Sequence, residues 1–302
     1  MPKIKSISRY TTTYDRAHVY DDSIVENKHQ VSYLEMDEQG NVIEDKTFDS
    51  EGNVENFIKR IFEKDNKLVE ESFFDGFEDQ AYEIREFVYD EQGVLVSGKI
   101  KYMEMGDEIE QQYIYSPDGK LIQKTVVYSD GTSYIENEYE WEGDNILKLA
   151  ENEEGDPVSL KEMIYNEQGQ IIELSTTEYS NKDQQTEKYE YDGDKLIKQS
   201  IFNYKGDLMT VADSKYDGDL LVERTVENSV QFFRHLFKYD EQGRKIQESV
   251  LNRDDLVLTD YLTQYNEDGL EMNTKTYSLN IVDEERELIL IEENSIQYSF
   301  FN

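Results

Sequence analysis

The sequence predicts an all-β protein built of tandem antiparallel β-hairpin repeats of about 25 residues, which form a long coiled or single-layer sheet. Three observations predict this fold class. An aromatic residue followed by a glycine turn recurs at a regular step, a second turn lies near the middle of each step, and the residues between turns alternate in polarity. Each repeat therefore contains two strands and two turns.

The first turn of each repeat begins with an aromatic residue and ends with glycine. The glycines at positions 93, 119, 143, 169, 193, 218, 243 and 269 follow one another at steps of 24 to 26 residues. A fixed period of this length is typical of proteins in which each unit stacks on its neighbours. The turns are Tyr89–Gly93, Tyr115–Gly119, Trp141–Gly143, Tyr165–Gly169, Tyr191–Gly193, Tyr216–Gly218, Tyr239–Gly243 and Tyr265–Gly269.

The second turn of each repeat is weaker in sequence and contains Gly, Asn or Asp. These residues accept a positive φ angle more readily than others, so each cluster predicts the tight reversal of a hairpin. The clusters are Met105–Asp107, Ser129–Gly131, Glu154–Asp156, Ser180–Lys182, Lys205–Asp207 and Arg253–Asp255.

The strands between the turns place apolar and acidic side chains on opposite faces, because successive residues of a strand point to alternate sides. In the strand 108–115, one face carries Ile109, Tyr113 and Tyr115, and the other carries Glu108, Glu110 and Gln112. The same alternation assigns Ser133, Ile135, Asn137, Tyr139 and Trp141 to one face of the next strand, and Thr132, Tyr134, Glu136, Glu138 and Glu140 to the other.

Aromatic residues two positions apart precede several of the first turns, so both rings of a pair share one face. The pairs are Phe87 with Tyr89, Tyr113 with Tyr115, Tyr139 with Trp141, Tyr189 with Tyr191 and Phe237 with Tyr239. We interpret these rings as packing rows; a row half open to solvent would instead stack on the rings of sugars or bases. The candidate binding residues are Tyr113, Tyr115, Tyr139, Trp141, Glu136, Glu138 and Glu140.

The repeat is clear over residues 80–280 and weaker toward both ends. Turns at Met36–Gly40 and Lys64–Lys67 continue it toward the N-terminus, and residues 1–35 and 281–302 have the character of capping units. No linker interrupts the series, so we expect a single β-repeat domain over residues 1–302. About twenty strands exceed the roughly ten that an open twisted sheet tolerates, so the sheet coils or stays a single layer with capped terminal edges.

Two of the turns resemble the YD repeats of Rhs-type proteins. The resemblance is carried by Tyr239-Asp240-Glu241-Gln242-Gly243, and less closely by Tyr89-Asp90-Glu91-Gln92-Gly93, and it extends over residues 30–270. It implies tandem β-hairpins that spiral into a shell or extended sheet, in bacterial surface, toxin-delivery or interaction proteins. The chain departs from that family because it is short, strongly acidic, and lacks a self-cleaving core segment and a variable C-terminal toxin.

Composition limits the function. The chain has 68 acidic and 31 basic residues and a formal net charge of −37. Such a charge repels nucleic acid and anionic membranes and attracts basic partners. Disorder is the alternative for so charged a chain, but the aromatic content of 12% and the regular turns argue against it. No signal segment or membrane span is evident, so we expect a cytoplasmic protein, or a surface or secreted one if a signal was removed.

The sequence offers little catalytic chemistry, and we predict neither an enzyme nor a cofactor. The histidines are His18, His29 and His235, without a second His at metal-ligand spacing and without cysteine, so we expect surface or packing roles for them. Asp-Gly turns such as Asp192–Asp194, Asp217–Asp219, Gly143–Asp144 and Gly206–Asp207 have oxygen ligands for calcium, but they are also favoured hairpin corners.

Two functional hypotheses follow. The first is a binding or scaffold protein whose acidic sheet engages a basic protein, as an inhibitor or immunity protein does. The second is a surface or carbohydrate-binding module that uses its tyrosine rows. Head-to-tail self-association through terminal edge strands is a third possibility, because Lys3, Lys5, Arg9 and Arg16 make the N-terminal segment basic, whereas the C-terminal segment is acidic.

Overall fold

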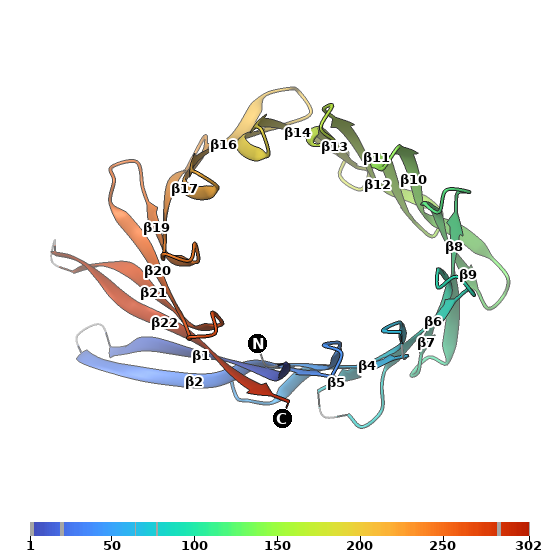
Figure 1. The fold of residues 1–302 in the computed structure, drawn as a ribbon, viewed down its shortest axis with the longest axis horizontal. Coiled ribbons are helices and arrows are strands. Elements are labelled where there is room, and N and C mark those ends of the chain that lie inside the picture. The colour runs from blue at the N-terminus through green and yellow to red at the C-terminus, as the bar shows by residue number, and fades with distance from the viewer. Residues whose placement is uncertain (1–2, 19–20, 64, 77, 283–284, 302) are drawn as a thin grey trace. The chain divides into compact units, whose positions relative to one another are not determined.

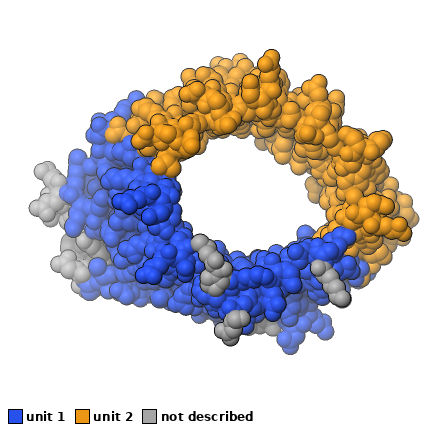
Figure 2. Space-filling model, viewed as in Figure 1, with its two compact units in different colours: residues 1–86, 102–106, 235–302 blue, residues 87–101, 107–234 orange. Residues whose placement is uncertain are grey.

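The computed structural model describes residues 3–18, 21–63, 65–76, 78–282 and 285–301. These residues form 22 strands and no helix, so the predicted all-β fold class is confirmed (Figure 1). Because the described part of the chain has no helix, it has none long and apolar enough to cross a lipid bilayer. The chain divides into two compact units (Figure 2): unit 1 comprises residues 1–86, 102–106 and 235–302, and unit 2 comprises residues 87–101 and 107–234.

Unit 1 holds a ladder of antiparallel strands in which the first and last strands of the chain are neighbours. The order is β19–β20–β21–β22–β1–β2–β3–β4–β5–β6. The bounds are β1 (Ile4–His18), β2 (Asp21–Met36), β3 (Val42–Phe48), β4 (Val54–Phe62), β5 (Leu68–Asp75), β6 (Glu83–Tyr89), β18 (Phe232–Tyr239), β19 (Lys245–Leu251), β20 (Val257–Tyr265), β21 (Glu271–Val282) and β22 (Glu285–Phe300).

Unit 2 holds a second antiparallel meander in which each strand pairs with the next along the chain. The order is β8 to β17 without interruption. The bounds are β7 (Leu95–Tyr102), β8 (Asp107–Tyr115), β9 (Leu121–Tyr128), β10 (Ser133–Glu142), β11 (Asn145–Glu153), β12 (Asp156–Tyr165), β13 (Ile171–Glu178), β14 (Asp183–Asp192), β15 (Lys195–Phe202), β16 (Leu208–Asp217) and β17 (Leu220–Asn228). The predicted repeat of two strands and two turns is therefore confirmed.

The terminal strands are paired, which corrects the predicted coiled or single-layer sheet with capped free edges. β1 pairs with β22 from Ile4 opposite Phe300 to Thr13 opposite Glu292. The terminal units at 1–35 and 281–302 thus satisfy each other's backbone groups instead of capping separate edges. The basic N-terminal and acidic C-terminal segments do meet, but within one molecule, so head-to-tail association through these strands would first have to break this ladder.

A β-bulge interrupts the alternation of strand β10, which corrects the face assignment of its first half. Ile135 lies opposite Thr125 and Asn137 lies opposite Lys124, so Glu136 is an extra residue without a counterpart. A bulge of this kind shifts the register of faces by one position. Tyr134 and Glu136 therefore share the face of Tyr139 and Trp141, whereas Ser133 and Ile135 lie on the face of Glu138 and Glu140.

Neither unit has a thick hydrophobic core. The buried apolar residues in the described ranges are Ile100, Val126, Ala212 and Leu251. The accessible surface is 19414 Å², whereas a globular protein of this mass exposes about 13,000 Å². Strand pairing, turn hydrogen bonds and side-chain fastening must therefore supply stability that a layered protein takes from core packing.

Candidate functional site

The candidate binding residues lie on β8 and β10 of unit 2 but do not form one site. Tyr113 and Tyr115 on β8 share a face with Tyr139, Trp141 and Glu136 on β10, because Tyr113 lies opposite Lys124 of β9 and Lys124 lies opposite Asn137. Glu138 and Glu140 point to the other face and are exposed. The sequence alternation placed all three glutamates together because it could not show the bulge at Glu136.

In most repeats, the aromatic residue that begins the first turn is hydrogen-bonded to the backbone of its own hairpin. The indole Nε1 of Trp141 donates a hydrogen bond of 2.8 Å to the carbonyl oxygen of Leu121, at the open end of the β9–β10 hairpin. The backbone pairing of these strands ends earlier, at Gln123 opposite Glu138. The side chain therefore continues the hairpin beyond the point where backbone pairing stops.

The same fastening recurs along both units, and we call it the aromatic latch. The ring hydroxyl donates to a carbonyl oxygen that lies 19 or 20 residues earlier in most repeats and 27 in the last. The latches are Tyr115 to Leu95 (2.8 Å), Tyr165 to Ile146 (2.9 Å), Tyr191 to Ile171 (3.0 Å), Tyr216 to Leu196 (3.1 Å), Tyr265 to Lys245 (2.9 Å) and Tyr298 to Glu271 (2.9 Å). Burial raises the pKa of the Tyr115 hydroxyl, and the nearby Asp90 raises it further. Tyr115 and Trp141 thus have a structural role.

The rings before the latch are also engaged. The Tyr113 hydroxyl donates to Oε1 of Gln111 at 3.2 Å. Lys124 lies over the Tyr113 ring, with Nζ 5.9 Å from its centroid, and pairs with Oε2 of Glu136 at 2.6 Å. Burial raises the pKa of Tyr139, and the carboxylates of Glu151 and Glu136 raise it further. Tyr113, Lys124 and Glu136 on this face thus contact one another within the sheet.

The opposite face of β10 is the acidic one. Glu138, Glu140 and Glu142 follow one another at alternate positions, and all three are exposed. Lys148, opposite Glu140 on β11, is the nearest cation in the register. Together with Tyr139 and Ala150, Glu138, Glu140 and Lys148 line a shallow hollow of about 280 Å³.

The aspartate carboxylates in the turns accept hydrogen bonds from backbone N–H groups of the same turn. Oδ1 of Asp90 accepts hydrogen bonds from the backbone N–H of Gln92 (2.9 Å) and Val94 (2.8 Å), and Asp240 does the same in its turn. Gly93, at the end of the first of these turns, has a φ of 83°. The Asp of the tyrosine–aspartate motif is therefore an internal turn cap, for which an Asx side chain is well suited.

The Asp-Gly corners have the geometry of tight hairpin turns. Asp192 pairs with Lys195 across the two-residue loop Gly193–Asp194, and Gly193 has a φ of 58°. A glycine with positive φ at the first central position is typical of a type II′ hairpin turn. Across the described ranges, no group of three or more His, Cys, Asp or Glu residues has the arrangement of a metal site.

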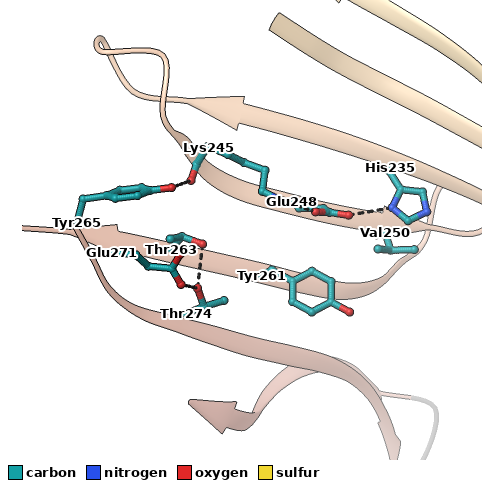
Figure 3. A pocket seen from close by; sticks show the side chains of 9 residues that line it. All are labelled: His235, Lys245, Glu248, Val250, Tyr261, Thr263, Tyr265, Glu271 and Thr274. Carbon is teal, nitrogen blue, oxygen red and sulfur yellow. Dashed lines mark hydrogen bonds and ion pairs between the residues drawn. The ribbon is translucent and has the colours of Figure 1, made fainter. Parts of the chain in front are cut away.

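A second hollow lies on the latch face of unit 1, between strands β18 and β21 (Figure 3). Its volume is about 340 Å³. Its aromatic walls are Tyr261 and Tyr265, and the Tyr261 hydroxyl makes no hydrogen bond to any residue in the described part of the chain. The lining residues are His235, Lys245, Glu248, Val250, Tyr261, Thr263, Tyr265, Glu271 and Thr274.

Glu248 is the centre of a polar cluster in this hollow. Its Oε1 accepts a hydrogen bond of 3.0 Å from Nδ1 of His235, and its Oε2 accepts one of 2.7 Å from Nζ of Lys245 (Figure 3). Burial opposes ionisation of Glu248, but the contacts with Lys245 and His235 outweigh it and hold the pKa of the carboxyl below its usual value. On the other side of the hollow, Thr274 donates to Glu271 and contacts Thr263, each at 3.0 Å.

The sequence reasoning missed this hollow, although the repeat contains its signal. The hairpins that end at Tyr115, Trp141 and Tyr191 have an aromatic residue two positions before the latch, whereas the hairpin that ends at Tyr265 has Thr263 there. The hollow lies where that ring is absent. A repeat-by-repeat alignment of the chain with itself would have marked Thr263, together with Met163 and Ser214, as positions that lack this ring.

Comparison with known proteins assigns no family. No family model matches the chain, and no curated protein matches it. Among solved structures, TcdB2-TccC3 without its hypervariable C-terminal region is 12% identical with a TM-score of 0.39; the match covers 85% of this chain and 16% of that one. A porin-like protein from Bacteroides uniformis is 8% identical with a TM-score of 0.37 and is covered over 98% of both chains. A further TcdB2-TccC3 structure is 9% identical with a TM-score of 0.30, and the match covers 97% of this chain and 24% of that one.

Proposed function

We propose that this chain is a YD-repeat-like binding or scaffold protein without catalytic activity, whose acidic β-sheet surface engages a basic protein partner. The supporting observation is the exposed row Glu138, Glu140 and Glu142 on the face of β10 opposite the latches. Carboxylates on one strand face recur every second residue, about 6.6 Å apart. A fixed anionic row of this kind attracts a cationic surface and accelerates its association.

The excess negative charge is not neutralised within the chain. The 31 basic residues are outnumbered by 68 acidic ones, and several lysines are already ion-paired. Lys124 pairs with Glu136, Lys188 with Glu173 (3.1 Å) and Lys215 with Glu223 (2.7 Å). The charge therefore remains available to a partner. It also disfavours a nucleic acid as that partner, because phosphates carry the same sign.

The test is affinity capture from the native host at low and high salt, followed by direct binding measurements with the recovered protein. We expect a basic protein that is lost at high salt, because a Debye length of about 10 Å at 0.1 M screens surface charge. Binding should weaken when Glu138, Glu140 and Glu142 are all changed to Gln. Turnover of a substrate by the purified chain would refute the proposal.

A matched control distinguishes the effect of the acidic face on binding from the effect of net charge. Glu91, Glu167 and Glu241 are exposed and occupy the same position in three tyrosine-glycine turns. Changing these three to Gln removes the same charge from turns instead of from the face of β10. Equal weakening by both triple variants would show that binding depends on total charge and not on this face.

A second candidate function, carbohydrate binding, is favoured by the hollow at Thr263. A gap in the aromatic row, flanked by Tyr261 and Tyr265 and lined by hydroxyl and carboxylate groups, suits a pyranose ring. Thr263→Tyr would fill the gap and abolish binding on a glycan array. The matched control is Ser214→Tyr, which makes the same kind of change two residues before the latch Tyr216 in unit 2.

A further inference from the structure

The two longest hairpins of unit 1 separate beyond the ladder that joins them. β1 and β22 are paired only as far as Thr13 opposite Glu292, although β1 continues to His18 and β22 begins at Glu285. Beyond that point the β1–β2 and β21–β22 hairpins run on as separate ribbons (Figure 1). We call the pair of facing strand segments, Tyr14–His18 and Glu285–Ile291, the fork.

A bulge explains why the strands part at this position. Thr276 of β21 lies opposite Glu292, but the next residue, Tyr277, lies opposite Leu290, so Ile291 is an extra residue in β22. A bulge bends its strand and increases the local twist. Ile291 is the residue immediately beyond the last pair with β1, so β22 bends at the point where the ladder with β1 ends.

We call the β1–β2 and β21–β22 hairpins beyond the ladder the arms of the fork. In each arm, the fork segment has one edge that is paired with its hairpin partner and one edge that is not. Tyr14, Asp15 and Arg16 pair with Glu26, Val25 and Ile24 of β2 on one side, and β22 pairs with β21 through Val282 opposite Glu285. On the sides that face the fork, these two segments have no strand partner within the described ranges. Unpaired N–H and C=O groups in a row are a template for an additional strand.

The β1–β2 arm is exposed on both faces near its tip, whereas the β21–β22 arm is exposed at Ile281, Arg286 and Glu287 and half-buried at residues 288–291. Residues 23–28 of β2 are all exposed, including Ile24 at 62% and Val25 at 43%, and on the other arm Ile281 is 58% exposed. A two-stranded hairpin in water is only marginally stable by itself. One strand inserted in the fork would join two such hairpins into a continuous five-stranded sheet and cover part of this apolar surface.

We propose that the fork accepts an extended segment of a partner protein by strand addition, with basic residues alternating with apolar ones in the bound segment. Charge selects this occupant, because the acidic residues in or beside the arms, Asp15, Glu26, Glu287, Glu292 and Glu293, outnumber the basic residues there, Arg16, Lys28 and Arg286. A second copy of this chain would bring the same acidic arms and be repelled. The inference rests on the proposed function, because it gives the basic partner a place and a mode of binding.

The test uses the full chain and a synthetic peptide that alternates lysine and valine over about seven residues, enough to span the β22 edge at ~3.3 Å per residue. Hydrogen–deuterium exchange should show at least about tenfold slower exchange at residues 14–18 and 285–291 when the peptide is bound. The same peptide with alternate backbone amides N-methylated keeps its charge but loses donors, and it should give no protection.

A shortened arm provides the matched variant. Replacing residues 16–24 by Asn-Gly leaves Asp15 opposite Val25 across a two-residue turn and removes most of one fork edge. We expect peptide affinity to fall at least about tenfold. Replacing residues 179–182 by Asn-Gly, between the paired Glu178 and Asp183, introduces the same two-residue turn in unit 2 without removing strand residues, and it should leave affinity unchanged.

The possible outcomes distinguish a failure of the fork proposal from a failure of the proposed function. Protection confined to residues 137–142 would overturn the fork while a basic partner still binds the acidic face. Absence of binding by the peptide at low salt would also overturn the fork, whereas capture of a basic partner tests the function independently. Dimers protected at residues 14–18 and 285–291 without peptide would identify a second copy as the occupant and overturn the assignment to a partner.

Discussion

The aromatic latch makes a quantitative prediction about stability. The change Tyr191→Phe removes only the hydroxyl that donates to the carbonyl oxygen of Ile171 at 3.0 Å. The ring, its packing and the backbone pairing of β13 with β14 are kept. A net intramolecular hydrogen bond contributes about 0.5–1.5 kcal/mol, and the value here should lie near the lower end because water can reach a carbonyl at the end of a hairpin.

Combining latches amplifies the effect to a range that is readily measured. Tyr165, Tyr191 and Tyr216 fasten three different hairpins, so their contributions should add. The triple change to Phe should lower the free energy of unfolding by roughly 1.5–2 kcal/mol. Urea unfolding followed by the fluorescence of Trp141, the single tryptophan of the chain, reports on the same unit.

The control is Tyr179→Phe, which makes the same chemical change at a ring that is 44% exposed and is not a latch. It should change the free energy of unfolding by less than about 0.5 kcal/mol. If the triple latch variant unfolds at the same urea concentration as the Tyr179 variant, the latches are incidental contacts. The explanation of the tyrosine period would then be wrong.

Three further predictions concern charge and turns. Glu151 accepts a hydrogen bond from Ser159 and lies 3.4 Å from Lys161, and these contacts, the Ser159 bond foremost, lower the pKa of its carboxyl. Its stabilisation is therefore complete above the unfolded pKa of about 4.3 and is lost as the pH falls through the lower folded value. Glu151→Gln should cost up to about 1 kcal/mol in urea unfolding at neutral pH, since the group is partly exposed, and nothing in strong acid; an equal cost at both pH values would contradict this. Gly169→Ala should cost about 1 kcal/mol by the same assay, because Gly169 has a φ of 77° and an added Cβ would meet only an ordinary contact at 3.8 Å; an unchanged unfolding midpoint would disprove that strain. Sodium chloride should raise the melting temperature by screening the carboxylates, and calcium should raise it no more than magnesium at equal ionic strength; a calcium-specific rise at micromolar concentration would show that the Asp-Gly corners bind it.

The hairpin repeat could be predicted because the residues that form each turn are close together in sequence. A turn such as Tyr89–Gly93 needs its own Asp90 to accept backbone hydrogen bonds and its own glycine to adopt a positive φ. The Asp and the glycine that meet these two requirements lie within five consecutive residues. The halfway turns are predictable for the same reason, and Asp255, with a φ of 62°, confirms that a non-glycine residue there adopts the left-handed conformation.

The faces of the strands and the terminal ladder were harder to predict because they depend on distant residues. Whether Glu136 is an extra residue is decided by how β10 meets Lys124 and Thr125 on β9, which the alternation within one strand does not contain. The pairing of Ile4 with Phe300 joins residues almost the whole chain apart, and no local pattern specifies it. The weak N-terminal repeats have a simpler cause, since Met36 and Phe62 end strands β2 and β4 without a hydroxyl to form a latch.

The candidate site was predicted only in part, for a related reason. Tyr115 and Trp141 were candidate binding residues, but the polar atom of each is used within its own hairpin. The hollow beside Thr263 arises from the absence of a ring, and residue patterns reveal what is present more readily than what is missing. His235 takes part in it only because β18 and β19 bring it to Glu248.

The short sequence distance between most latches and their acceptors has an evolutionary consequence. Trp141 and Leu121, like Tyr191 and Ile171, are separated by 20 residues, less than one repeat. A duplicated stretch of one repeat would therefore carry donor, acceptor and turn cap together and would need no compensating change elsewhere to close its hairpin. A chain of this kind can lengthen by whole copies of one segment, while the exposed side chains of each copy diverge independently.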